Sequence, residues 1–98
     1  MSTDLQAVLA AIRSQRDDAR ARYRVEMIGV AGSLARGEAG PESDIDIVVD
    51  FLPGASLFKI GGLLCELEAA LQRRVDLLDR QSLKAPIKAA VERDLVAA

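Results

Sequence analysis

The chain has 98 residues, of which half are apolar and 29% are charged, so it is long enough for one globular domain over residues 1–98 and too short for two. Its net charge of −2, from 13 basic and 15 acidic residues, excludes a broad basic surface, and direct binding to nucleic acid is not expected. One cysteine cannot form an internal disulfide, and neither a signal peptide nor an apolar run of membrane-spanning length is recognised, so we predict a cytoplasmic protein without a membrane partner.

The first half of the chain is predicted to alternate between helix and strand. Apolar residues at helical spacing predict a helix over about Thr3–Arg22. A segment with alternating apolar positions follows and predicts a strand over Tyr23–Ala31. A short helix is expected over Ser33–Arg36, ending at Gly37, because glycine is favoured directly after a helix. After a loop marked by glycine and proline, the second strand is predicted over about Ile45–Phe51.

The second half continues the same alternation. Ser56 is the expected N-cap of a helix from Leu57 to about residue 72, in which Gly61 and Gly62 either permit close packing or weaken the first turn. A short strand is predicted over Arg74–Leu78, and a last helix from about Leu83. This order predicts an α/β (α+β) fold, with a small mixed sheet of three to four strands flanked by helices, mainly on one face.

Two carboxylates lie at the start of the second strand. Asp44 and Asp46 are two residues apart, so they point to one face while Ile45, Ile47 and Val49 point into a core. At a separation of about 6–7 Å along a strand, two ionised carboxylates repel unless a cation lies between them. Mg²⁺ is the expected cation, because it takes oxygen ligands and shares them with substrate phosphates. Considered alone, Asp44 can equally be a turn residue ahead of a strand.

A second set of candidate site residues precedes Asp44 and Asp46 in the sequence. Gly32 leaves room for a phosphate to approach the backbone, and free N–H groups at the start of a helix favour an anion. Ser33 can contribute to this site or act as a plain helix cap. Arg36 can clamp a phosphate or pair with Glu38 or Glu42. We therefore take Gly32, Ser33 and Arg36 as the candidate nucleotide-binding residues.

The complete pattern, Gly32-Ser33, ten residues and then Asp44-x-Asp46, resembles that of the minimal nucleotidyltransferases of the DNA polymerase β-like superfamily. Either half of the pattern alone is a weak signal, whereas both halves at this spacing, in a strand–turn–strand setting, are specific. The resemblance covers nearly the whole chain, because those proteins are about this short. Ala31 departs from it, since many relatives carry an aromatic residue before the Gly-Ser pair.

The resemblance implies a catalytic site with a third carboxylate from a later strand. Asp76 fits by position and by alternation, although a solvent-facing strand residue is the alternative. Asp44, Asp46 and Asp76 would then be both the catalytic residues and the metal ligands, with two Mg²⁺ ions and ATP as the substrate. Because the chain has no histidine, Asp76 could also accept the proton of the acceptor. Asp50, farther along the same face, is expected to be solvated at the strand end.

The resemblance also implies a partner. Larger relatives carry an additional domain for the acceptor, whereas only about twenty residues follow Asp76 here, so we expect another chain to supply the acceptor. Minimal nucleotidyltransferases of this kind are typically paired with a HEPN-domain toxin and transfer AMP from ATP to a tyrosine hydroxyl of that toxin, thereby acting as antitoxins. The alternatives are a noncatalytic antitoxin that neutralises its partner by contact, and a small-molecule nucleotidyltransferase of the antibiotic-resistance type.

Overall fold

The structure is a computed structural model, and it describes residues 3–40 and 42–98. The first half contains α1 (Thr3–Asp18), a π-helical turn (Ala19–Tyr23), β1 (Val25–Ala31), α2 (Gly32–Ala35) and β2 (Ile45–Phe51). The second half contains α3 (Leu57–Leu71), β3 (Val75–Asp79), a 3₁₀ turn (Arg80–Ser82), α4 (Ile87–Asp94) and β4 (Val96–Ala97).

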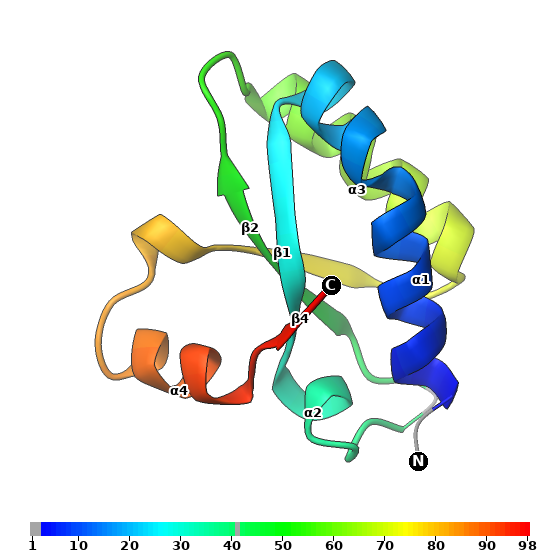
Figure 1. Cartoon of the computed structure of the whole chain (residues 1–98), viewed down its shortest axis with the longest axis vertical. Helices are drawn as coiled ribbons and strands as arrows, with labels where there is room; N and C mark the ends of the chain where they lie inside the picture. Colours follow the sequence, from blue (N-terminus) through cyan, green and yellow to red (C-terminus); the bar gives the residue numbers. More distant parts are fainter. Residues whose placement is uncertain (1–2, 41) are drawn as a thin grey trace.

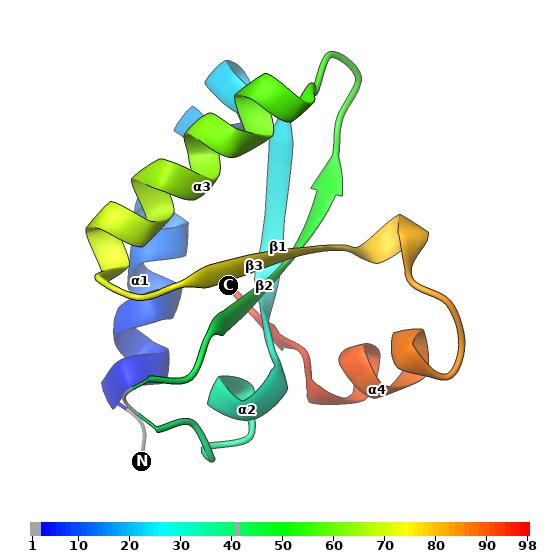
Figure 2. The same ribbon diagram turned by 180° about the vertical axis from the view of Figure 1, so that it is seen from behind.

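The strands form one mixed sheet in the order β3-β2-β1-β4. β2 is antiparallel to β1 and parallel to β3, and the short β4 is antiparallel to β1. The two long helices, α1 and α3, lie together on one side of the strands, whereas α4 lies on the other side (Figures 1 and 2). The predicted fold class is confirmed, and the sheet has four strands in the described part of the chain.

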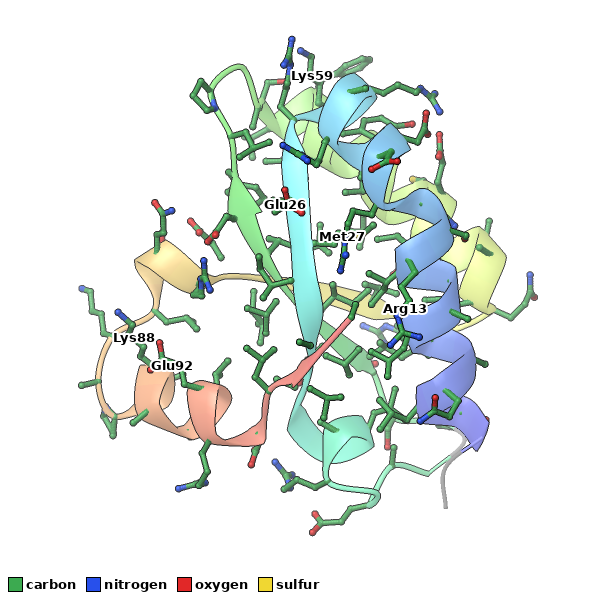
Figure 3. The ribbon with its side chains drawn as sticks, viewed as in Figure 1. Arg13, Glu26, Met27, Lys59, Lys88 and Glu92 are labelled. Carbon is green, nitrogen blue, oxygen red and sulfur yellow. The ribbon has the colours of Figure 1, made fainter. Side chains whose placement is uncertain are left out.

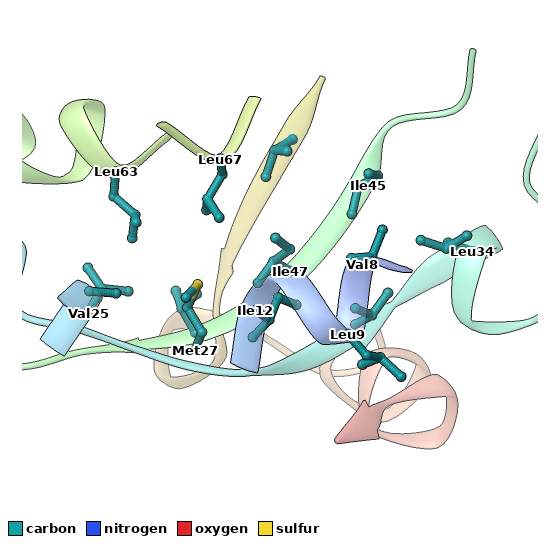
Figure 4. Packing of buried hydrophobic residues seen from close by; sticks show 14 residues of the cluster. Val8, Leu9, Ile12, Val25, Met27, Leu34, Ile45, Ile47, Leu63 and Leu67 are labelled. Carbon is teal, nitrogen blue, oxygen red and sulfur yellow. The ribbon is translucent and has the colours of Figure 1, made fainter. Parts of the chain in front are cut away.

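The core lies between the sheet and the two long helices (Figure 4). The inward residues predicted for the second strand, Ile45, Ile47 and Val49, are fully buried. They alternate with residues that point to the opposite face, as the period of a strand requires. Burying each such side chain stabilises the fold by about 1.5–3 kcal/mol. The buried side chains that the two helices contribute are Val8, Leu9 and Ile12 of α1, and Leu63 and Leu67 of α3.

The surface of the helices is partly polar and partly apolar. Arg13 on α1 and Lys88 and Glu92 on α4 are exposed charged side chains (Figure 3). At the start of α3, by contrast, Leu57 is 88% exposed and Phe58 is 92% exposed. No helix in the described part of the chain is both long and apolar enough to cross a membrane.

The junction between α1 and β1 differs from the prediction. The strand was expected to begin at Tyr23, but the helical turn continues through this residue, and Arg24 then adopts a left-handed backbone conformation with φ of 59°. The Tyr23 hydroxyl donates a hydrogen bond to Glu66 of α3, and its ring lies against Gly62, where an added Cβ would approach the ring to 3.0 Å. Close packing on the sheet was one predicted alternative for the two glycines, but Gly62 packs against the Tyr23 ring of the π-helical turn, and an added Cβ at Gly61 would meet nothing within 4 Å.

The C-terminal segment differs most from the prediction. A helix was expected from about Leu83, but α4 begins only after Pro86, and the chain then returns to the sheet as β4. Proline disfavours a helical conformation at the residue before it, which explains the late start of α4. β4 fits because Gly29 of β1 has no side chain, since a Cβ there would overlap the carbonyl oxygen of Val96.

We expect the substitution Gly29→Ala to separate β4 from β1. The added methyl group would overlap backbone atoms of Val96 and Ala97, which cannot rotate away, so the free energy of unfolding should fall by about 1–3 kcal/mol. Urea unfolding measures this loss. Hydrogen exchange of the Ala98 amide, which donates to the Ile28 carbonyl at 3.0 Å, reports on the pairing itself.

Gly61→Ala is the matched control for this prediction, because its added methyl group meets no atom within 4 Å. In a helix interior this change should stabilise the protein by up to about 1 kcal/mol. Wild-type stability of Gly29→Ala, together with a protected Ala98 amide, would contradict the close approach of β4.

Candidate active site

Two of the predicted carboxylates meet through the pairing of β2 with β3. Asp46 of β2 lies directly opposite Asp76 of β3 in the parallel register. Asp44 precedes the first residue of β2, Ile45, whose N–H donates to the Arg74 carbonyl oxygen at 2.9 Å. Neighbouring strands are about 4.8 Å apart, so the side chains of paired residues are close neighbours on one face of the sheet. The structure therefore makes Asp46 and Asp76 neighbours, and Asp44 lies two residues before Asp46 at the start of β2.

The electrostatics of Asp46 reflect this arrangement. Partial burial raises the pKa of Asp46, and the negative charges of Asp76 and Asp44 raise it further. The positive charge of Arg36 lowers the pKa of Asp46 and so opposes this shift. A raised pKa means that the ionised form of Asp46 destabilises the fold at neutral pH. A cation bound between the carboxylates would remove this penalty.

The outer two carboxylates are more accessible than Asp46. Asp44 and Asp76 are both exposed, and Oδ1 of Asp44 forms an ion pair with Nε of Arg74 at 4.0 Å. That pair is weak, because the Arg74 side chain is 87% exposed. Over residues 3–40 and 42–98, no group of three or more acidic, thiol or imidazole side chains is gathered tightly enough to hold a metal ion.

These carboxylates nevertheless fit Mg²⁺ in their chemistry. All three candidates offer oxygen atoms, and burial together with the negative charges of the other two raises the pKa of Asp46. Mg²⁺ is commonly held by one or two carboxylates together with substrate phosphates and water, so it does not require a closed protein cage. The metal-binding role of Asp44, Asp46 and Asp76 remains a prediction.

Gly32 is needed for a reason that the sequence did not show. Its φ is +74°, a left-handed conformation that favours glycine, and an added Cβ would overlap Oδ2 of Asp46. Ala31, the residue before it, pairs with Asp46 across β1 and β2. Gly32 therefore leaves room for the Asp46 carboxylate, in addition to any approach of a phosphate to the backbone.

Ser33 does not cap α2. The helix begins at Gly32, one residue earlier than predicted, and its N-cap is Ala31, which makes no side-chain capping bond. The interpretation of Ser33 as a plain helix cap was therefore wrong, because the register of the turn places this residue inside the helix. A role of Ser33 in nucleotide binding stays a prediction.

Arg36 is already engaged by two acidic residues. Its Nε donates to Oε1 of Glu38 at 3.1 Å, as one of the predicted alternatives proposed, and its Nη1 donates to Oδ2 of Asp94 at 2.7 Å. Sequence reasoning missed Asp94, which is 58 residues away along the chain. No local pattern signals this contact, because it depends on the return of the C-terminal segment to the sheet.

Asp50 does not belong to the cluster of carboxylates. It was expected to be solvated at the strand end, and this prediction was wrong, because its side chain is only 13% exposed and accepts two hydrogen bonds from Arg80. Arg80 follows β3 in the 3₁₀ turn and reaches back to β2. The fork of its guanidinium neutralises Asp50, so this charge does not repel Asp46.

A carboxylate cluster beside a glycine-rich turn is the arrangement expected for transfer of a nucleotide, and comparison with known proteins agrees. Residues 12–97 match the family model described as the nucleotidyltransferase domain. The chain belongs to this family. This nucleotidyltransferase is 42% identical over 92 residues to protein adenylyltransferase MntA of Thermococcus cleftensis. The match covers 94% of this chain and 93% of the relative. It is 35% identical over 86 residues to a Methanocaldococcus jannaschii protein assigned as a protein adenylyltransferase, covering 87% of this chain and 88% of the relative.

Solved structures place the fold in the same group. A structure assigned as a minimal nucleotidyltransferase matches with a TM-score of 0.71 and 33% identity, covering 90% of this chain and 93% of the other. A crystal structure of a toxin–antitoxin with AMP-PNP matches with a TM-score of 0.68 and 26% identity, covering 89% of this chain and 68% of the other. The resemblance to minimal nucleotidyltransferases inferred from the sequence is confirmed.

Proposed function

We propose that this nucleotidyltransferase transfers AMP from ATP to a tyrosine hydroxyl of a HEPN-domain toxin, and that it thereby acts as an antitoxin. The observation that carries the proposal is the meeting of Asp46 and Asp76 across paired strands, next to the Gly32 turn. The named relatives support a protein as the acceptor, since the Thermococcus cleftensis relative is a protein adenylyltransferase. The toxin–antitoxin structure supports a toxin as the partner and an ATP-like nucleotide as the ligand.

The residues of the site divide the chemistry between them. Asp44, Asp46 and Asp76 would hold Mg²⁺, which when bound offsets the charge of the phosphates and of the attacking oxygen. The turn at Gly32 and Ser33, with Arg36, would bind the phosphates. In the transfer, the acceptor oxygen forms a bond to the α-phosphorus, the bond to the β-phosphate oxygen breaks, and pyrophosphate leaves. Asp76 would accept the proton of the acceptor, because the chain has no histidine to serve as the base.

A contact antitoxin is the second candidate, and one observation favours it. Leu57 and Phe58 expose nearly their whole side chains, and exposed apolar surface of this kind is typical of sites that bind another protein. Neutralisation by contact would require equal amounts of the two proteins and would not depend on Asp46. Catalysis would not require equal amounts and would depend on Asp46. The two candidates therefore differ both in stoichiometry and in the effect of replacing Asp46.

The deciding experiment is a titration of this protein into the ribonuclease assay of its partner with ATP and Mg²⁺, followed by intact-mass spectrometry of the partner. We expect protection at substoichiometric amounts, with the partner heavier by whole AMP units. The Asp46→Asn variant, used as the control, should give neither effect. Protection only at equal concentrations, with an unchanged partner mass, would replace the enzymatic proposal with the contact antitoxin.

A further inference from the structure

We propose that Asp94, the last residue of α4, is a positioning residue that holds Arg36 in the orientation in which it binds the phosphates of the nucleotide. This inference rests on the proposed function, in which Arg36 is a phosphate-binding residue. It assigns the C-terminal segment of the chain a part in the nucleotide site, although that segment contributes none of the three carboxylates.

The contact between Asp94 and Arg36 is short, and its acidic partner is largely buried. Asp94 Oδ2 accepts from Arg36 Nη1 at 2.7 Å, and the Asp94 side chain is only 12% exposed. Glu38, the other partner of Arg36, is 64% exposed and accepts at 3.1 Å, so it should hold the guanidinium less firmly. Arg93 lies 3.8 Å from the other Asp94 oxygen, but its own side chain is 75% exposed. Asp94 is therefore the main anchor of Arg36.

The anchored guanidinium retains the capacity to bind a ligand. A guanidinium has five N–H donors, and its two hydrogen bonds to Asp94 and Glu38 use two of them. An arginine that is free to rotate loses about 2 kcal/mol of side-chain entropy when it is fixed. An arginine that an acidic neighbour already holds has lost part of that freedom before the ligand arrives, which favours binding.

Arg36 lies beside the carboxylates. Its backbone N–H donates to the Gly32 carbonyl oxygen at 3.1 Å, and Gly32 borders the Asp46 carboxylate. The charge of Arg36 lowers the pKa of Asp46, so the guanidinium acts electrostatically on the site in which the phosphates would bind. Arg36 is thus close enough to serve that site from the end of α2.

Asp94 is connected through β4 to β1, the strand that leads into the Gly32 turn. Two residues after Asp94, β4 pairs with Gly29 and Val30 of β1, and β1 leads directly into α2. At the chain end, Nη2 of Arg16 donates to the Ala98 carbonyl oxygen at 2.8 Å and holds the segment against α1. α2 and α4 lie next to each other at one end of β1 (Figures 1 and 2). Both partners of the ion pair therefore lie in segments attached to β1, Arg36 through α2 and Asp94 through the pairing of β4.

If Asp94 instead competed with the nucleotide for Arg36, its removal would change the nucleotide affinity in the opposite direction. If Asp94 competed with the phosphates for Arg36, it would be a latch that has to open before the nucleotide binds. Its removal would then tighten nucleotide binding, whereas removal of a positioning residue weakens it. The direction of the change in affinity distinguishes the two roles.

The test is calorimetric titration with an ATP analogue that carries a methylene bridge between the α- and β-phosphates, in the presence of Mg²⁺. For Asp94→Asn we expect roughly a tenfold loss of affinity, corresponding to the loss of one charge-assisted hydrogen bond. Asp94→Glu should restore part of this loss, because it keeps the charge. Glu38→Gln, the matched control at the exposed partner of Arg36, should bind nearly as well as the wild type.

An Arg36→Ala background separates positioning from a purely structural role. If Asp94 acts through Arg36, Asp94→Asn should cause no further loss of affinity in that background. An equal loss in both backgrounds would make Asp94 structural only, and unchanged or tighter binding by Asp94→Asn would also overturn the inference. In each of these cases the wild type still binds, so the proposed function stands. If the wild type itself does not bind the analogue, the proposed function fails together with the inference.

Discussion

Replacing Asp44 and Asp46 by asparagine is expected to reduce nucleotidyl transfer by on the order of a thousandfold or more, while the protein stays folded. Asparagine keeps the shape of each side chain but removes the charge that would hold Mg²⁺. Asp44 is exposed and Asp46 is only partly buried, so the core residues of β2 are not disturbed. Transfer is measured with labelled ATP and the partner protein, and the fold by circular dichroism. Insoluble protein would show that these residues are structural.

The charge of Asp46 also predicts how its replacement changes the stability of the fold. Because the pKa of Asp46 is raised in the fold, the stabilisation associated with this group is present in acid and is lost as the pH rises through the folded pKa. Without metal at neutral pH, Asp46→Asn should therefore melt at a higher temperature than the wild type, and the difference should shrink on acidification. Mg²⁺ should raise the melting temperature of the wild type more than that of the variant.

Asp17→Asn is the matched control for this stability prediction, because it removes one exposed acidic charge from α1, away from the sheet. It should leave both the melting temperature and its dependence on Mg²⁺ nearly unchanged. A lower melting temperature of Asp46→Asn at neutral pH would contradict the destabilisation of the fold by ionised Asp46, which burial and the neighbouring negative charges cause.

Gly32→Ala should cause the second large effect. The substitution puts a side chain at φ of +74°, which costs about 1–2 kcal/mol, and its methyl group would overlap Oδ2 of Asp46. Asp46 must then move, and a displacement of about 1 Å in a catalytic group can reduce the rate about a hundredfold. We therefore expect both lower stability and a loss of transfer, measured by urea unfolding and by the labelled-ATP assay.

Gly37→Ala separates the two causes. Gly37 has φ of +77°, close to the value for Gly32, but an added Cβ there would meet nothing within 4 Å. Both variants should lose similar stability from the backbone, whereas only Gly32→Ala should lose most of its transfer activity. Equal transfer activity of the two variants would show that the overlap of the added methyl group with Asp46 does not affect transfer.

Several elements could be predicted from the sequence because their causes are local. β2 was predicted with its observed bounds, since alternating buried residues define a strand over a few positions. Ser56 caps α3 as expected, accepting from the Lys59 N–H at 3.2 Å, because an N-cap bond spans only three residues. The pattern of Gly32, Ser33, Asp44 and Asp46 also lies within one short stretch, so the family resemblance was evident without the fold.

Only the tertiary structure decided the contacts between distant segments. The register of β3 places Asp76 opposite Asp46, the 3₁₀ turn brings Arg80 to Asp50, and the return of β4 brings Asp94 to Arg36. None of these pairs follows from periodicity, because each depends on how two separately formed elements pack. The two-residue strand β4 carries too little pattern to be distinguished from the end of a helix. Its position depends instead on Gly29 of β1, which pairs with Ala97 and has no side chain to block the approach of β4.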